Sequence, residues 1–178
     1  MWRLASALLV WSSAACSGGT GVSSHLLPKG PSSATLDSIH LERTRCFGTC
    51  PAYRLSLDRA GRVRFWSLNP GDVDRTAQDS VSPEALLYLE REAERIRFFA
   101  LPDSLAGTHL CADRATDRPT VIVTVFGPRG RKRVADYHGC FERSDHSVKP
   151  VVGQLRTFER MIDGVVGSFR WVRPAQRR

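Results

Sequence analysis

Several signatures that define enzyme families are missing from this sequence of 178 residues. It has no G-x-S-x-G nucleophile elbow, no phosphate-binding loop, no H-E-x-x-H zinc motif and no calcium-binding loop. It also lacks a C-x-x-C pair, the spacing that disulfide-exchange enzymes carry at a helix N-terminus. These absences leave no catalytic residue to nominate, and we expect a protein that is not an enzyme and needs no cofactor.

Long hydrophobic runs are scarce as well. The apolar stretch from Leu4 to Trp11 is much shorter than the roughly 20 residues of a membrane-spanning helix. A short positive start precedes this stretch, and the small residues Ser13-Ala14-Ala15 follow it. Together these features predict a signal peptide over residues 1–15 and an exported protein of the cell envelope.

The residue after these small ones is Cys16, which resembles the lipidated cysteine of bacterial lipoproteins. That resemblance implies a lipid on Cys16; the alternative is ordinary cleavage after Ala15, which leaves the cysteine unmodified. Residues 16–36 are rich in Ser, Gly, Thr and Pro, and we predict a flexible tether there. The lipid would anchor the protein to the periplasmic or surface side of a membrane.

The remaining composition is that of a globular domain, with 42% hydrophobic and 25% charged residues. We expect a single domain over residues 37–173 and a basic tail at 174–178. Basic residues outnumber acidic ones by 26 to 18. A predicted basic patch consists of Arg129, Arg131, Lys132 and Arg133. Export makes a nucleic-acid partner unexpected, so an anionic envelope polymer or an unidentified protein is the candidate partner.

Alternation of apolar and polar residues predicts two hairpins. The first has an alternating strand at residues 53–57 and a type I turn at 58–61. The second has a β-branched strand at 120–126 and a turn at 127–130. Residues 169–172 are interpreted as a short closing strand.

Two amphipathic helices are predicted, at residues 83–97 and 150–164. Ser82-Pro83-Glu84 begins the first with an N-cap serine and a proline, and Gly164 or Gly167 ends the second. The elements therefore follow one another as strands, helix, strands, helix. Because no βαβ alternation requires a parallel sheet, this order predicts an α+β fold. We expect an antiparallel sheet of about five strands, made of two hairpins and an N-terminal strand, with both helices on one face.

The segment LERTRCFGTCPAYRLSLDRAGRVRF, residues 41–65, resembles the bacterial domain of unknown function 6438. That family pairs a C-F-G-x-C-P-x-Y start with a hairpin. Thr116-Asp117-Arg118-Pro119-Thr120 and Asp136-Tyr137 resemble its second hairpin, and the resemblance covers residues 38–172. It implies an envelope protein or lipoprotein and supplies no activity, ligand or catalytic residue.

The cysteines provide the candidate site residues. Five are present, and assigning Cys16 to the lipid leaves an even number, which indicates disulfides in an exported chain. These four are Cys46, Cys50, Cys111 and Cys140. Three connectivities are possible, and we favour Cys46–Cys50 and Cys111–Cys140. Gly48 permits the tight turn that the first of these bonds needs.

A soft-metal site is the alternative. The C-x-x-x-C-P motif at residues 46–51 resembles the copper site of chaperones that help to assemble cytochrome oxidase, and thiolates select Cu(I). His109 and His138 each precede a cysteine by two positions, and two histidines with two cysteines can hold zinc. The alternative function is thus a copper- or zinc-binding envelope protein that uses Cys46, Cys50 and a histidine. The favoured function is a disulfide-stapled, non-catalytic binding or scaffolding module.

Overall fold

The computed structural model describes residues 34–70, 75–141 and 148–172. The predicted signal peptide, Cys16, most of the predicted tether and the predicted basic tail lie outside these residues. The strands are β1 (Ser38–Arg43), β2 (Tyr53–Asp58), β3 (Arg62–Ser67), β4 (Thr76–Ser80), β5 (Asp113–Arg114), β6 (Thr120–Gly127), β7 (Gly130–Tyr137) and β8 (Cys140–Phe141). The helices are α1 (Glu84–Arg95) and α2 (Pro150–Val166), with 3-10 turns η1 (Phe98–Ala100) and η2 (Ser168–Arg170).

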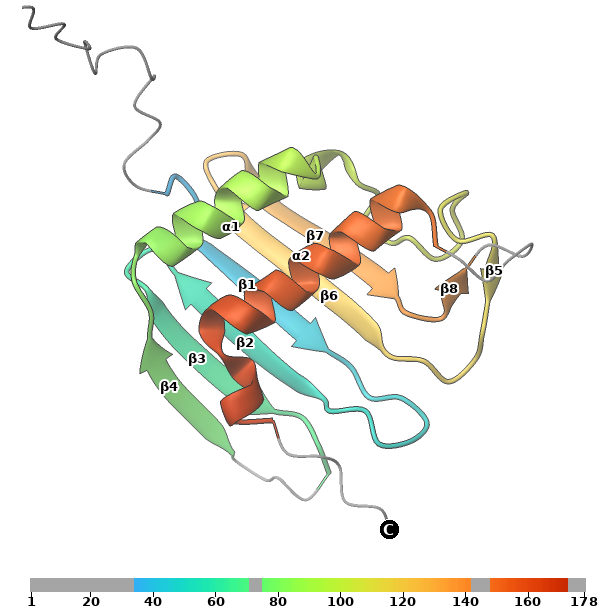
Figure 1. Cartoon of the computed structure of the whole chain (residues 1–178), viewed down its shortest axis with the longest axis horizontal. Coiled ribbons are helices and arrows are strands. Elements are labelled where there is room, and N and C mark those ends of the chain that lie inside the picture. The colour runs from blue at the N-terminus through green and yellow to red at the C-terminus, as the bar shows by residue number, and fades with distance from the viewer. Residues whose placement is uncertain (1–33, 71–74, 142–147, 173–178) are drawn as a thin grey trace, which may run out of the picture. The chain divides into compact units, whose positions relative to one another are not determined.

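An antiparallel sheet of six strands forms the centre of the fold, in the spatial order β4-β3-β2-β1-β6-β7 (Figure 1). The strand β1 pairs with both β2 and β6, so it joins the two predicted hairpins into one sheet. The predicted α+β class, with a mostly antiparallel sheet and two helices, is confirmed. The strand count differs from the prediction of about five, because β4 extends the sheet and β5 pairs separately with β8.

Two predictions about the periphery of the sheet are wrong. The sequence analysis missed β4, whose only apolar residue is Ala77; as an edge strand it pairs with β3 alone and needs little apolar surface. The closing strand expected at residues 169–172 is instead largely the 3-10 turn η2. The reason is Gly167, whose φ of 64° turns the chain sharply at the end of α2.

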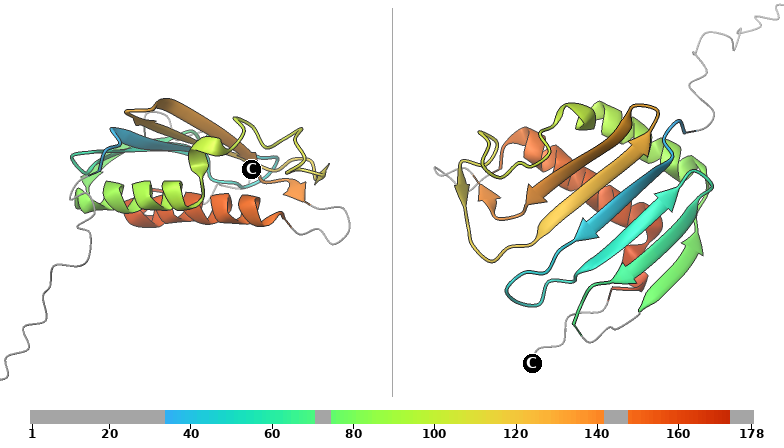
Figure 2. Two further views of the ribbon diagram at one scale, coloured as in Figure 1. Left: turned by 90° about the horizontal axis from the view of Figure 1, so that it is seen from above. Right: turned by 180° about the vertical axis from the view of Figure 1, so that it is seen from behind.

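Both helices lie on one face of the sheet, and no described helix covers the other face (Figure 2). We call these the covered face and the open face. The core between the helices and the sheet includes the fully buried Leu41, Phe65, Phe98 and Phe158, and the rings of the last two lie 5.9 Å apart. Among the residues that the structure describes, no helix has both the length and the apolar character needed to cross a membrane.

Candidate functional site

The structure bonds the same two cysteine pairs that the sequence analysis favours. The sulfurs of Cys46 and Cys50 lie 1.97 Å apart, and those of Cys111 and Cys140 lie 2.08 Å apart. Gly48, inside the first loop, has a φ of 144° that side chains rarely allow, so the glycine permits this tight reversal. Each bond thus joins two loop or strand-end positions that the fold brings close together.

A hollow of about 350 Å³ lies beside the first disulfide. Its lining consists of Arg43, Cys50, Pro51, Tyr53, Pro119, Val121, Phe169 and Val172. The two polar side chains of this lining, Arg43 and Tyr53, both bind the carboxylate of Asp163. The hollow therefore presents mainly apolar surface.

The four residues of the predicted basic patch at the β6–β7 turn form two separate pairs. The guanidinium of Arg129 lies 3.9 Å from the centre of an aromatic ring in η1, and Lys132 Nζ lies 2.7 Å from a carboxylate oxygen of Asp103. Arg131 and Arg133 lie on the open face, because side chains two positions apart on a strand share a face. The four residues therefore do not form one patch.

Pairing across the sheet surrounds these two arginines with side chains from other strands. Arg131 is opposite Phe126 on β6. Arg133 is opposite Thr124, which in turn is opposite His40 on β1. The ring centres of His40 and Phe126 are 4.9 Å apart. The fold thus gathers basic and aromatic side chains that are far apart in the sequence.

Two hollows, of about 370 and 480 Å³, meet on the open face and share His40 and Arg54 in their linings. Arg54 is opposite Trp66 in the second hollow, and Arg64 lies beside it, opposite Ser56. We call the joined surface the arginine groove. Its defining residues are His40, Glu42, Arg54, Trp66, Phe126, Arg131 and Arg133.

Positive charge dominates the arginine groove. The lining of its two hollows contains one acidic residue, Glu42, which accepts a hydrogen bond of 2.7 Å from Arg54. Arg131 and Arg133 form no salt bridge with a carboxylate among the described residues, and the Arg133 charge acts on Asp103 only without such contact. Burial lowers the pKa of His40, and the charges of Arg54 and Arg131 lower it further. The groove is therefore an environment that disfavours added cations and favours anions.

A second polar region lies on the covered face, beneath α2. The register places Asp136, Arg43 and Tyr53 in one row near the end of the sheet. Asp163 of α2 accepts hydrogen bonds of 2.6 Å from Arg43, Tyr53 and Ser168. Burial and the neighbouring Asp163 charge raise the pKa of Tyr53, so the phenol stays protonated and donates. The Asp163 carboxylate thus has its hydrogen-bond donors within the protein.

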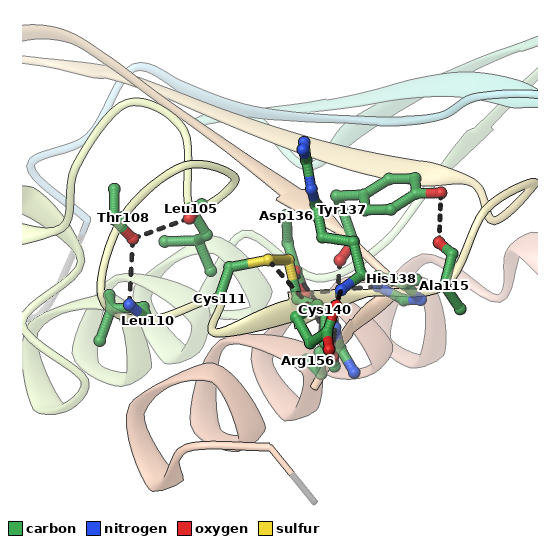
Figure 3. The surroundings of a disulfide bond; sticks show 12 residues. Leu105, Thr108, Leu110, Cys111, Ala115, Asp136, Tyr137, His138, Cys140 and Arg156 are labelled. Atoms are coloured by element: carbon green, nitrogen blue, oxygen red, sulfur yellow. Dashed lines mark hydrogen bonds and ion pairs between the residues drawn. A yellow bond between two sulfur atoms is a disulfide. The ribbon is translucent and has the colours of Figure 1, made fainter. Parts of the chain in front are cut away.

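One turn earlier on α2, Glu159 faces His138 at the end of β7. The distance from His138 Nε2 is 2.8 Å to Glu159 Oε2 and 3.6 Å to Asp136 Oδ2. Arg156 donates to that same Asp136 oxygen at 2.8 Å. Asp136, His138 and Arg156 lie beside the second disulfide (Figure 3). Both carboxylates are buried, with side-chain exposures of 0% and 1%, while the imidazole is 27% exposed. Burial raises the pKa of Glu159.

A family model described as a domain of unknown function matches residues 37–162. The chain belongs to the DUF6438 family. The family resemblance drawn from residues 41–65 is thereby confirmed. The matched residues include both disulfides, the arginine groove and the group formed by Asp136, His138 and Glu159. A search among curated proteins finds no match.

This DUF6438 domain does not assemble the metal set that the sequence analysis proposed as an alternative. Cys46 and Cys50 are bonded to each other, so neither offers a thiolate. His109 is exposed, and His138 lies against two carboxylates instead of against free cysteines. Of the nominated ligands, only His138 lies in a group of side chains that suits a metal ion.

Sequence reasoning also missed residues that define both polar regions of the DUF6438 domain. Glu159 lies within the apolar stripe of α2, between Leu155 and Ile162. A carboxylate at a core-facing helical position was the available signal, because glutamate is rarely buried without a partner. A weaker signal was the placement of Asp136 and His138 two positions apart at the end of a strand. The arginine groove has no local signal, since it depends on the pairing of β1 with β6.

Proposed function

We propose that this DUF6438 domain is a non-catalytic binding module of the cell envelope, and that its ligand is an acidic polysaccharide held in the arginine groove. The observation that supports this proposal is the gathering of arginine and aromatic side chains on the open face. No described helix occupies that face, so a ligand would meet the sheet directly.

The side chains of the groove suit the two chemical parts of an acidic sugar. A guanidinium donates two parallel hydrogen bonds to a carboxylate, sulfate or phosphate, and Arg131 and Arg133 form no salt bridge with a carboxylate among the described residues. Trp66 and Phe126 offer flat apolar faces on which a sugar ring can stack. A polymer with a charge on each ring would match a groove in which basic and aromatic side chains alternate.

The burial of the aromatic rings favours a polymer over a lipid surface. Trp66 and Phe126 are half-buried and lie within the hollows. Peripheral membrane proteins instead present apolar side chains that enter the boundary between headgroups and acyl chains. We therefore assign the groove to an extended anionic chain, and binding to anionic vesicles becomes an outcome that the test must exclude.

We further propose that the domain acts outside the cytoplasm. In this proposal residues 1–15 are removed, Cys16 carries a lipid, and residues 16–36 hold the domain away from the membrane. The two disulfides support this location, because such bonds persist in oxidising compartments. Intact mass spectrometry of the protein from its host should show a chain that begins at Cys16 and carries the added mass of a lipid. A chain that retains its first residues would contradict the proposal.

The binding test uses polygalacturonate as the acidic polysaccharide and dextran as a neutral one. Two double variants of the same hairpin give a matched comparison. Arg131→Ala/Arg133→Ala removes two charges from the groove, and Arg129→Ala/Lys132→Ala removes two charges outside it. We expect the first pair to weaken binding about tenfold and the second less than about twofold. Added salt should weaken the binding of polygalacturonate, and dextran should not bind.

Three results would contradict this function. Equal losses in the two double variants would mean that net charge, and not the groove, attracts the polymer. If dextran bound as tightly as polygalacturonate, the charge of the arginines would have no role in binding. Binding to phosphatidylglycerol vesicles that is tighter than binding to polygalacturonate would identify the open face as a membrane surface.

A further inference from the structure

We propose that Asp136, His138 and Glu159 form a binding site for a divalent transition-metal ion of the Zn²⁺ type. One nitrogen of the imidazole and one oxygen from each carboxylate all lie within 4.8 Å of one another. The site is on the covered side of the sheet, beneath α2, whereas the arginine groove is on the open face. This inference therefore stands apart from the proposed polysaccharide binding.

The distances between donor atoms suit a small cation. Zinc binds nitrogen and oxygen ligands at about 2.1 Å, so two ligands of a tetrahedral ion lie about 3.4 Å apart. The distances from His138 Nε2, 2.8 Å to Glu159 and 3.6 Å to Asp136, lie on either side of that value. An ion would draw the three donor atoms, which all lie within 4.8 Å of one another, to this spacing.

The charges in the group also favour a cation. Two buried carboxylates repel each other, and each needs compensation inside the protein. Arg156 compensates Asp136 through its hydrogen bonds. Among the described residues Glu159 shares a hydrogen bond with His138, its buried Oε1 has no hydrogen-bond partner, and the Arg43 charge acts on it without such a bond. A divalent ion would take the place of the proton between His138 and Glu159 and would supply the missing positive charge.

Arg156 is a positioning residue and not a competitor for the ion. A carboxylate oxygen has more than one lone pair, so Asp136 Oδ2 can accept from Arg156 and also bind a metal. The same guanidinium donates to the backbone carbonyl of Tyr137 at 3.2 Å, which holds the end of β7 against α2. Outer hydrogen bonds of this kind orient metal ligands in known sites.

The backbone around His138 is also held in place. Its N–H donates to the carbonyl of Pro119 at 3.0 Å, and Cys140, two residues later, is bonded to Cys111 (Figure 3). Because His138 is partly exposed, an ion has a route from solvent. Nitrogen and oxygen ligands suit Zn²⁺ or Mn²⁺ and do not suit the soft Cu(I) ion.

The test is titration of the full-length, disulfide-bonded protein with Co²⁺, followed by visible absorption, and with Zn²⁺, followed by calorimetry. His138→Gln and His109→Gln form a matched pair, because each histidine precedes a disulfide cysteine by two positions. We expect one site that involves His138, a loss of affinity of more than about tenfold in His138→Gln, and no change in His109→Gln.

Circular dichroism would show that both variants are folded, which is expected since His138 is partly exposed. A second variant, Glu159→Gln, should also lose the Co²⁺ absorption. Zn²⁺ should raise the melting temperature of the unmodified protein and of His109→Gln, but not that of His138→Gln or Glu159→Gln. The proposal is overturned if the folded protein takes up neither ion. It is equally overturned if His138→Gln binds as tightly as the unmodified protein.

Discussion

The two faces of one sheet use their polar side chains in opposite ways. On the covered face, Arg43 and Asp163 are mostly buried and bind each other. On the open face, Arg131 and Arg133 form no salt bridge with a carboxylate among the described residues. A charge beneath a helix must be compensated inside the protein, whereas water compensates a charge on an uncovered strand. The polar residues of the covered face therefore hold the fold together, whereas Arg131 and Arg133 on the open face form no salt bridge with the described residues.

The largest expected effect concerns the disulfide beside the covered polar region. The Cys111–Cys140 bond closes a separation of 29 residues, whereas Cys46–Cys50 closes one of 4. In the chain-entropy model, the double alanine variants should lower the free energy of unfolding by about 3.6 and about 1.9 kcal/mol respectively. Urea denaturation measures both losses. Equal losses would show that loop length does not govern the two bonds.

The next effect compares a charge on each face. Asp163→Ala leaves the Arg43 guanidinium without its carboxylate and the Tyr53 hydroxyl without its acceptor. We expect the free energy of unfolding to fall by about 3 kcal/mol. Arg64→Ala, on the open face, should change it by less than about 0.5 kcal/mol. A loss at Arg64 as large as the loss at Asp163 would break the contrast between the faces.

A smaller effect is the pH dependence that Glu159 contributes from the covered face. Burial raises the pKa of this carboxyl above its ordinary value of 4.5, so the folded protein keeps a proton that the unfolded chain has lost. The free energy of unfolding should therefore fall as pH rises from 4.5 through the raised pKa. Urea denaturation at a series of pH values, without added metal, should show this slope, and Glu159→Gln should flatten it. An unchanged slope in the variant would assign it to another group.

The smallest effect is the pH dependence that His40 contributes from the open face. Its sign is opposite to that of the Glu159 contribution. Burial and two arginines lower the pKa of His40 below 6.5, so the free energy of unfolding should fall as pH decreases from 6.5 through the lowered pKa. Polygalacturonate in the groove should raise this pKa, because its charge offsets that of the arginines. Titration by NMR measures the shift, with the exposed His109 as the internal control. If the pKa of His40 is the same with and without polygalacturonate, the polymer binds elsewhere.

Much of the fold could be predicted because its signals are local. Alternation at residues 53–57 and helical spacing within residues 150–164 each report which face of an element is buried. The cysteine count and the predicted export indicated two disulfides, and the pairing in the structure is the one favoured among three possible connectivities. The strand β4 could not be predicted, because an edge strand of mostly polar residues carries no pattern of burial. The closing strand predicted at residues 169–172 does not form for a related reason. One left-handed glycine before these residues outweighs their β-branched and aromatic side chains.

The sequence by itself determined the fold class and the family of this protein, because residues close in the chain carry that information. Tertiary structure alone decided which polar residues act together. Pairing of β1 with β6 placed His40 in one groove with Arg133, and the packing of α2 brought Glu159 to His138. The physical reason is that these residues are far apart in the chain, and only the pairing of strands and the packing of a helix bring them together. Arg43 on the covered face is therefore a structural partner, whereas we propose that Arg131 on the open face is a binding group.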